Sequence, residues 1–404
     1  MHSWKRNQAA VTAAAFVGFT GFTLVMPFLP LYIRQLGVTD IGEIALWTGV
    51  TLGISPAIAA LTAPLWGRVG DRFGNKLLVQ RSLVSFIVAM TAMAYVTRPW
   101  HLFALRAVQG FFAGYGPLTL SMAALSAPRE KMALAIGTVQ TAQRMGPAIG
   151  PVIGGVLAPL FGLRNSFFVA AALYFVALVM VTILFKEPPP PPRAPPQPGR
   201  IGRHGGVAPL NFLLVMLVLF ALQLVDRSFG PVLPLHLDEL GYAPADVPVI
   251  AGILFSILAL TAAFGNQLSS RVLKRHSPRV VIMWAVVTAA AALGAFAVST
   301  SIWLLAASLA VVGLCLGTSI TTAFAAGGAV IPQDVHATGF GFLTSASLSG
   351  VAISPVLSGL VASYSIRAVF LMAVVVLLTL AVVVRRVMVE RNPPVEPTPV
   401  VEES

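Results

Sequence analysis

The chain has little charge and almost no cysteine. Charged residues make up 10% of its 404 residues, and Cys315 is its one cysteine. A single cysteine excludes an intramolecular disulfide and argues against a cysteine-based metal site. Hydrophobic residues instead reach 57%, and the mean hydropathy is +0.87. A soluble core does not need this much apolar sequence, so the composition indicates a membrane protein.

The sequence also lacks the signatures of common enzymes. It contains no G-x4-G-K-S/T phosphate-binding loop, no H-E-x-x-H zinc motif and no G-x-S-x-G nucleophile motif. No segment between the apolar runs exceeds about 25 residues. We therefore expect neither an ATP-driven pump nor an enzyme, and no cofactor. No feature of the sequence indicates a receptor or a scaffold.

Twelve apolar runs follow one another along the chain. Because a helix needs about 20 apolar residues to cross roughly 30 Å of hydrocarbon, we expect an all-α membrane protein with twelve transmembrane helices. The predicted spans are 9–33, 44–66, 77–97, 101–125, 132–160, 165–185, 210–235, 247–268, 279–298, 302–326, 338–362 and 366–388.

The net charge of +12 would suit a nucleic-acid-binding protein, but the distribution of the bases does not. If the N-terminus is cytoplasmic, 19 of the 26 Lys and Arg residues lie in loops and tails on that side, and four lie on the other. Arg81 is counted here among the bases of the cytoplasmic loop after the second span. This asymmetry follows the positive-inside rule, which places both termini in the cytoplasm. We expect no nucleic-acid partner.

The proline- and glycine-rich stretch 186–209 separates six spans from six and has the composition of an extended, partly flexible linker. It divides the chain into an N-terminal bundle, 1–185, and a C-terminal bundle, 210–390. The tail, 391–404, is expected to be disordered.

The two halves are related by an internal repeat. Residues 26–37 align with 230–241, and the same offset of 204 relates Gly155 to Gly359. Several matches at nearly one offset indicate duplication. Six spans in each half keep both halves in the same orientation, so the repeat is parallel.

The segment GTVQTAQRMGPAIGPVIGG, at 137–155, is rich in helix-weakening residues yet is long and apolar enough to cross a bilayer. A span that keeps both glycine and proline usually needs close helix packing and a bend. We expect its small-residue face to pack against the other half of the protein; generic small-residue packing is the alternative. The residues concerned are Gly137, Gly146, Gly150, Pro151, Gly154 and Gly155.

Three motifs resemble those of the major facilitator superfamily. GRVGDRFGNK at 67–76 is similar to the family's G-x3-D-R-x-G-x-R/K loop, and RAVQG at 106–110 is similar to its fourth-span R-x-x-Q-G motif. The segment at 137–155 resembles the fifth-span motif G-x8-G-x3-G-P-x2-G-G, which is associated with antiporters and not with symporters. The start of the chain looks like the twelve-span bacterial multidrug:proton antiporters. The resemblance covers all but the linker and tail, and implies two parallel-related six-helix bundles.

The loop motif is thought, in that family, to latch the two halves in the outward-facing state. The resemblance assigns this conformational switching to Gly67, Asp71, Arg72, Gly74 and Lys76. The glycines permit a tight turn, the aspartate can interact with a helix N-terminus, and the bases can anchor the cytoplasmic face. An ordinary positive-inside turn is the alternative.

Asp226 is the one acidic residue deep in a predicted span. It lies roughly nine residues, or roughly 14 Å along a helix, before the outer end of span seven. An ionisable residue at that depth is a functional candidate, so we assign Asp226 to proton coupling. A static salt bridge with Arg106, Arg144 or a more distant base is the alternative. Successive helix residues point about 100° apart, so a direct pair with Arg227 is not expected.

Three arginines lie within the spans. Arg106 resembles the family's fourth-span arginine, which is proposed to assist proton movement; hydrogen bonding to helix carbonyls is an equal alternative. Arg144 either contacts substrate or balances Asp226. Three arginines against one aspartate weaken any expectation of cationic substrates and allow neutral or anionic ones.

A set of aromatic, polar and charged residues is the candidate lining of a substrate cavity, with lipid-facing or core packing as the alternative for each aromatic ring. The set is Phe19, Phe22, Phe112, Tyr115, Gln140, Arg144 and Arg227.

These features together suggest a proton-coupled exporter of hydrophobic or amphipathic small molecules that works by alternating access. The closest rival is a transporter of one metabolite or nutrient. We expect a monomer in the bacterial cytoplasmic membrane, with lipid, a small-molecule substrate and protons as its partners.

Overall fold

The computed structural model describes residues 2–128, 131–186, 209–331 and 336–387, and its regular elements are helices. Most of the proposed linker and the whole tail lie outside these residues. The first half comprises α1 (His2–Thr23), η1 (Met26–Phe28), α2 (Leu29–Gln35), α3 (Ile41–Phe73), α4 (Asn75–Met93), α5 (Pro99–Phe111), α6 (Tyr115–Ser126), α7 (Met132–Phe161) and α8 (Leu163–Leu184). The second half comprises α9 (Pro209–Arg227), α10 (Phe229–Glu239), α11 (Val247–Val272), α12 (Pro278–Val298), α13 (Ile302–Val330), α14 (His336–Ala362) and α15 (Ile366–Val387).

Eleven segments within the described residues are long and apolar enough to cross a membrane. The remaining predicted span, 101–125, is formed by α5 and α6, which have 13 and 12 residues and are each too short to be counted alone. Between them Gly114 adopts φ +115°, a conformation that glycine tolerates. Pro117 disfavours a continuous helix at this point because its ring would clash with the carbonyl four residues earlier. The prediction of an all-α architecture with twelve crossings is confirmed.

Spans one and seven break at equivalent points of the repeat. α1 ends at Thr23, four residues before Pro27, and α9 ends at Arg227, four residues before Pro231. A proline inside a helix removes one backbone hydrogen bond and clashes with the carbonyl four residues earlier. The duplicated proline therefore accounts for both breaks, and in the second half the break falls beside Asp226.

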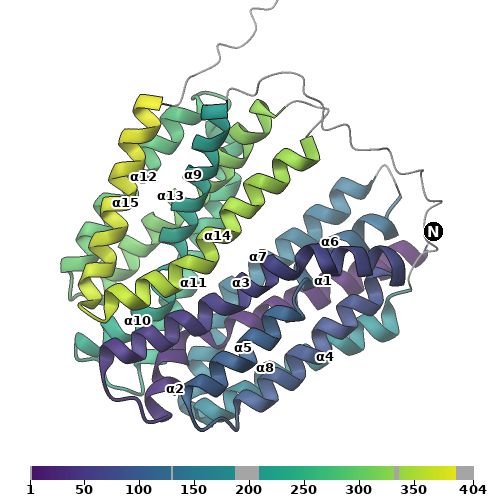
Figure 1. Cartoon of the computed structure of the whole chain (residues 1–404), viewed down its shortest axis with the longest axis horizontal. Helices are drawn as coiled ribbons and strands as arrows, with labels where there is room; N and C mark the ends of the chain where they lie inside the picture. Colours follow the sequence, from purple (N-terminus) through teal and green to yellow (C-terminus); the bar gives the residue numbers. More distant parts are fainter. Residues whose placement is uncertain (1, 129–130, 187–208, 332–335, 388–404) are drawn as a thin grey trace, which may run out of the picture.

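The helices form two groups, one from each half of the chain, which meet at one side of the molecule and diverge toward the other (Figure 1). We call the side at which α8 ends and α9 begins the linker side. The opposite side, where α2 and α10 end, is the far side. The arrangement is closed on the far side.

Glycines close the far side at two places that the repeat relates. A Cβ atom at Gly155 of α7 would overlap the backbone of Pro248, which lies in α11. At the equivalent Gly359 of α14, a Cβ atom would lie 2.5 Å from the carbonyl oxygen of Ala45, which lies in α3. At each place the two backbones touch, as small residues in membrane helices allow. The far-side contact thus has a twofold pattern set by the duplication.

One ion pair joins the two halves directly at the far side. Arg34 Nη2 of α2 lies 2.5 Å from Asp238 Oδ2 of α10. The two residues are 204 positions apart and therefore occupy the same position in the two repeats. Equivalent positions meet each other at a twofold axis. The duplicated chain has placed opposite charges there, which favours closure of the far side.

Reversing one of these charges should open the far side. We expect Asp238→Arg to lower the far-side-closed population by about twofold to fivefold, a small effect because the pair is partly exposed. Spin labels at Gln35 and Glu239, in a Cys315→Ser background, would report the distance between the halves. The double variant Arg34→Asp/Asp238→Arg should restore the wild-type distances. A single variant with wild-type distances would show that the pair does not hold the halves together.

Candidate functional site

A cavity of about 600 Å³ lies between the two halves. Its walls come from α1 and α7 of the first half and from α9, α10, α11 and α13 of the second. The walls are mostly apolar and include Phe19, Phe255 and Phe324. Such a cavity, with few polar groups set in apolar walls, is typical of small-molecule sites. Its polar lining consists of Thr23, Gln143, Arg144, Gln223, Asp226, Arg227, Asn266 and Thr321.

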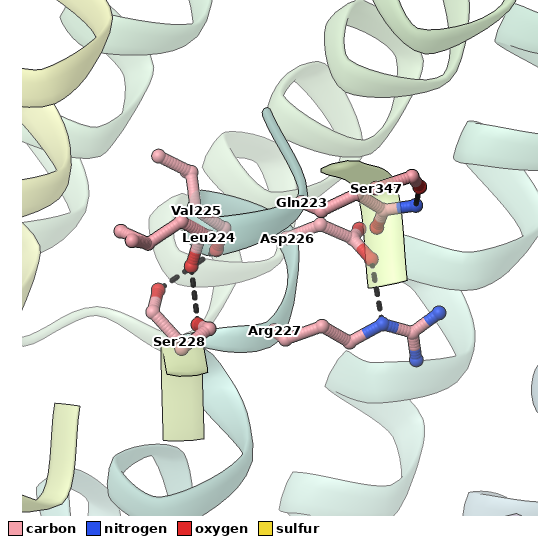
Figure 2. Close-up of polar contacts among 8 residues, drawn as sticks. Gln223, Leu224, Val225, Asp226, Arg227, Ser228 and Ser347 are labelled. Carbon is pink, nitrogen blue, oxygen red and sulfur yellow. Dashed lines mark hydrogen bonds and ion pairs between the residues drawn. The ribbon is translucent and has the colours of Figure 1, made fainter. Parts of the chain in front are cut away.

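Asp226 lies on this wall and pairs with its neighbour. Its Oδ2 atom is 3.1 Å from Arg227 Nε, and their side chains are 18% and 41% exposed (Figure 2). The expectation that these two residues would not meet was wrong. Both residues lie in the last turn of α9, but the arginine side chain is long enough to reach back to the carboxylate with Nε.

A second polar contact fixes the helix that carries Asp226. One turn earlier on α9, Gln223 Nε2 donates to Ser347 Oγ of α14 at 2.9 Å (Figure 2). Further along, Ser354 Oγ donates to the carbonyl oxygen of Leu224. These bonds hold α9 against α14 in the turn that precedes the aspartate.

Arg144 links the two halves across the cavity. The hydrogen-bonding neighbours of Asn266 fix the orientation of its side-chain amide. In this orientation the amide oxygen of Asn266 accepts a hydrogen bond from Arg144 Nη1 at 2.7 Å. The Asn266 amide nitrogen then donates to Thr321 Oγ1 at 2.9 Å and to the Gly317 carbonyl at 2.7 Å. Arg144 is thus held by a neutral partner and forms no ion pair within the part of the chain that the structure describes.

Arg106 lines a smaller side cavity of about 160 Å³ among α1, α3, α5 and α14. The residue is buried, and its Nη1 donates to Gln109 Oε1 at 3.0 Å. The guanidinium carbon lies 5.9 Å from the centre of the Phe22 ring, which lines the same side cavity. Arg227 lines both cavities, so the two adjoin each other there.

The other candidate lining residues are more scattered. Tyr115 is buried behind Phe19, and its hydroxyl donates to the Ala14 carbonyl, so it does not line either cavity. Gln140 is exposed and also lies outside both linings. Gln143, one turn further along α7, lines the main cavity and donates to Thr119 Oγ1 at 3.0 Å.

Phe112 lies outside both cavities, beside the break between α5 and α6. The carbonyls of Phe112 and Ala113 accept hydrogen bonds from Arg81 Nη2 at 3.0 and 3.1 Å. The Arg81 guanidinium carbon lies 3.4 Å from the centre of the Trp66 ring. Carbonyls freed by a helix break need partners inside a membrane. Arg81 therefore caps the break from within α4, which corrects its assignment to a loop.

The loop motif is described only in part. Gly67, Asp71 and Arg72 belong to the last turns of α3, but their side chains lie outside the described residues. Gly74 separates α3 from α4 with φ +89°, and Lys76 Nζ donates to the Phe185 carbonyl at 2.7 Å. Lys76 thus ties the start of α4 to the end of α8.

The glycine-rich segment of α7 packs against two different parts of the protein, α1 and α11. Cβ atoms at Gly146 and Gly150 would overlap residues of α1, and one at Gly154 would overlap Leu24, directly after α1, so all three contacts lie within the same half. Gly155 faces Pro248 of α11, and the carbonyl oxygen of Pro151 faces Gly252 of that helix. Gly137 has open space around it. The expectation that the whole face packs against the other half therefore holds only for the far-side end.

Two amides on the wall of the main cavity are not among the residues predicted from the sequence. Asn266 and Gln223 are uncharged, so a search for ionisable residues within spans passes over them. A search for amides inside apolar runs would have found both.

Comparisons with known proteins agree with this fold. A profile of the Major Facilitator Superfamily matches residues 11–215 and 212–403. The chain is 31% identical to the multidrug resistance protein MdtG of Proteus mirabilis, over 70% of this chain and 71% of that protein. It is 30% identical to MdtG of Dickeya zeae, over 91% of each. A multi-drug resistance efflux pump PmrA homolog of Lactococcus lactis is 31% identical over 71% of each chain.

Two solved transporters share the fold at low sequence identity. A bacterial homolog of the human lysosomal transporter Spinster, in an inward-facing and occupied conformation, has a TM-score of 0.78 at 16% identity, covering 96% of this chain and 98% of that one. The nucleoside transporter NupG has a TM-score of 0.75 at 15% identity, covering 94% and 98%. With its duplicated bundles and helix-lined cavity, this chain is a multi-pass membrane protein that belongs to the major facilitator superfamily.

Proposed function

We propose that this protein exports hydrophobic or amphipathic small molecules in exchange for protons, by alternating access. The observation that carries the proposal is the cavity of about 600 Å³ between two duplicated halves that touch at the far side. A rocking motion of one half against the other would expose this cavity to each side in turn. The multidrug resistance proteins named above support export as the direction.

The proposed setting is the bacterial cytoplasmic membrane, with the linker side and both termini in the cytoplasm and the protein acting as a monomer. The excess of Lys and Arg on the linker side supports this orientation. Single cysteines replacing Arg98 on the far side and Lys131 on the linker side, in a Cys315→Ser background, would test it. An impermeant thiol reagent added to whole cells should label only the first.

Asp226 is the proposed coupling group. It is the one acid on the described walls of either cavity, and its side chain is 18% exposed. Protonation would break its pair with Arg227 and favour one orientation of the halves, while substrate would favour the other. Ligands shift such an equilibrium only by their difference in affinity for the two states.

A transporter of a single metabolite is the second candidate. The observation that favours it is the hydrogen-bonded set formed by Arg144, Asn266 and Thr321, which could recognise one polar compound. The mostly apolar walls favour the multidrug proposal.

Reconstitution in proteoliposomes with an imposed pH gradient distinguishes these proposals. The exporter proposal expects a panel of unrelated amphipathic compounds to move against the proton flux. Movement of substrate and protons in the same direction would refute antiport. Transport of a single compound from the panel would favour the metabolite transporter.

A further inference from the structure

Two residues that line the side cavity each carry a buried hydrogen-bond donor with no acceptor among the described residues. Arg106 and Gln109 are each 2% exposed, and both line the cavity. The one hydrogen bond recorded between their side chains joins Arg106 Nη1 to Gln109 Oε1 at 3.0 Å. Arg106 Nε and Gln109 Nε2 have no partner within the described part of the chain. Donors left unpaired at such burial are costly, and a buried charge without a counter-ion is more so.

The charges around this cavity do not supply the missing acceptor. No acidic residue is among its described lining. Asp226, on the adjoining main cavity, already pairs with Arg227. Arg144 is held by the neutral Asn266. The two cavities together therefore carry an excess of two positive charges.

The size and surroundings of the side cavity suit a small anionic group. Its volume of about 160 Å³ is many times the roughly 10–15 Å³ that a cavity needs to hold one water molecule. Its remaining walls are mainly apolar, with Phe22, Leu52, Phe86 and Val351 among them. Through Arg227 and Met26 it adjoins the larger apolar cavity.

We propose that the side cavity binds the carboxylate of an amphipathic organic acid, whose apolar part occupies the main cavity. Arg106 and Gln109 donate to the carboxylate oxygens, and Phe19 and Phe324 contact the apolar part. Guanidinium donors bind a carboxylate with geometric specificity, because its two oxygens match the arrangement of their N–H groups. This inference rests on the proposed transport function and names its substrate class.

The test uses three matched probes: phenylbutyrate, phenylbutyramide and phenylbutylamine. They share an aromatic ring and a short chain and differ in the charge of the head group. Isothermal titration of the full-length protein in a neutral detergent would measure each affinity. We expect the carboxylate to bind at least about tenfold more tightly than the amide, and the amine to bind most weakly. Equal or stronger binding of the amine would overturn the proposal.

Gln109→Glu provides the discriminating variant. The new carboxylate occupies almost the same volume and gives Arg106 an internal counter-ion, so it competes with an anionic ligand. We expect this variant to lose the preference for phenylbutyrate while its thermal stability stays equal or rises. Gln140→Glu adds the same charge outside both cavities and should bind phenylbutyrate as the wild type does. Wild-type affinity for phenylbutyrate in Gln109→Glu would refute the site.

Flux measurements with the same probes separate this inference from the proposed function. If phenylbutylamine is exported in exchange for protons and phenylbutyrate is not, the transport function stands and the carboxylate site fails. If phenylbutyrate binds with the expected preference but no probe crosses the membrane, the site stands and the transport function fails.

Discussion

Replacement of Gly155 by alanine should abolish most transport while leaving the protein folded. The added Cβ atom would overlap the carbonyl of Pro248 and lie 3.1 Å from the Cα atom of Val249. Both obstacles are backbone, so α7 and α11 must separate to make room. Overpacking of this kind costs about 1–3 kcal/mol. If that cost falls on the far-side-closed state alone, the equilibrium constant for closing the far side falls roughly fivefold to 150-fold.

The measurement combines proteoliposome transport with the distance between spin labels at Gln35 and Glu239. Gly155→Ala should lengthen that distance as its transport rate falls. Gly137→Ala on the same helix is the matched control, because no heavy atom lies within 4 Å of its Cβ position. The repeat predicts that Gly359→Ala behaves like Gly155→Ala. Wild-type distances and transport in Gly155→Ala would show that this contact does not control closure.

Asp226→Asn should uncouple proton movement from substrate movement. Asparagine has nearly the same shape but cannot take up and release a proton. We expect substrate-driven proton flux to fall to the level of protein-free liposomes, while exchange of labelled for unlabelled substrate continues. Asp246→Asn, which removes an exposed acid at the start of α11, should leave the proton flux unchanged.

Arg227→Gln separates coupling from a static role of the ion pair. It breaks the contact of 3.1 Å but keeps the carboxyl group. If Asp226 carries the proton, Arg227→Gln keeps proton flux even where substrate affinity changes. If both variants lose proton flux and thermal stability equally, the pair is structural and the coupling assignment fails. Full proton flux in Asp226→Asn would refute it outright.

Much of the fold could be predicted from sequence because membrane-spanning helices have simple sequence patterns. Apolar runs and the distribution of bases arise from the membrane environment, and the repeat arises from duplication of the chain. The break in span four could not be predicted in this way. Its apolar run is continuous, but the break at 112–114 depends on the carbonyls finding Arg81 as a partner. That partner lies on α4, more than thirty residues away in sequence.

The candidate site was predictable in kind but not in arrangement. Asp226 and Arg106 stand out in sequence because charge inside a membrane is rare. Their distribution between a main and a side cavity depends on how α1, α3, α9 and α14 cross. Phe112 and Tyr115 resemble the cavity-lining Phe19 in sequence, but packing turns them away from both cavities.

By itself, the sequence determined twelve spans, two related halves, one membrane-embedded acid and an excess of embedded arginine. The spans and the embedded charges follow from the composition of the apolar runs, which lipid requires, and the related halves follow from the internal repeat. Only the tertiary structure decided that Arg34 meets Asp238 across the repeat and that Gly155 touches α11 while Gly146 touches α1. It also decided that Arg106 Nε and Gln109 Nε2 are buried without a partner among the described residues. Such pairings depend on how the helices cross, because one residue on a helix can face lipid, a neighbour or a cavity without any change in the local pattern.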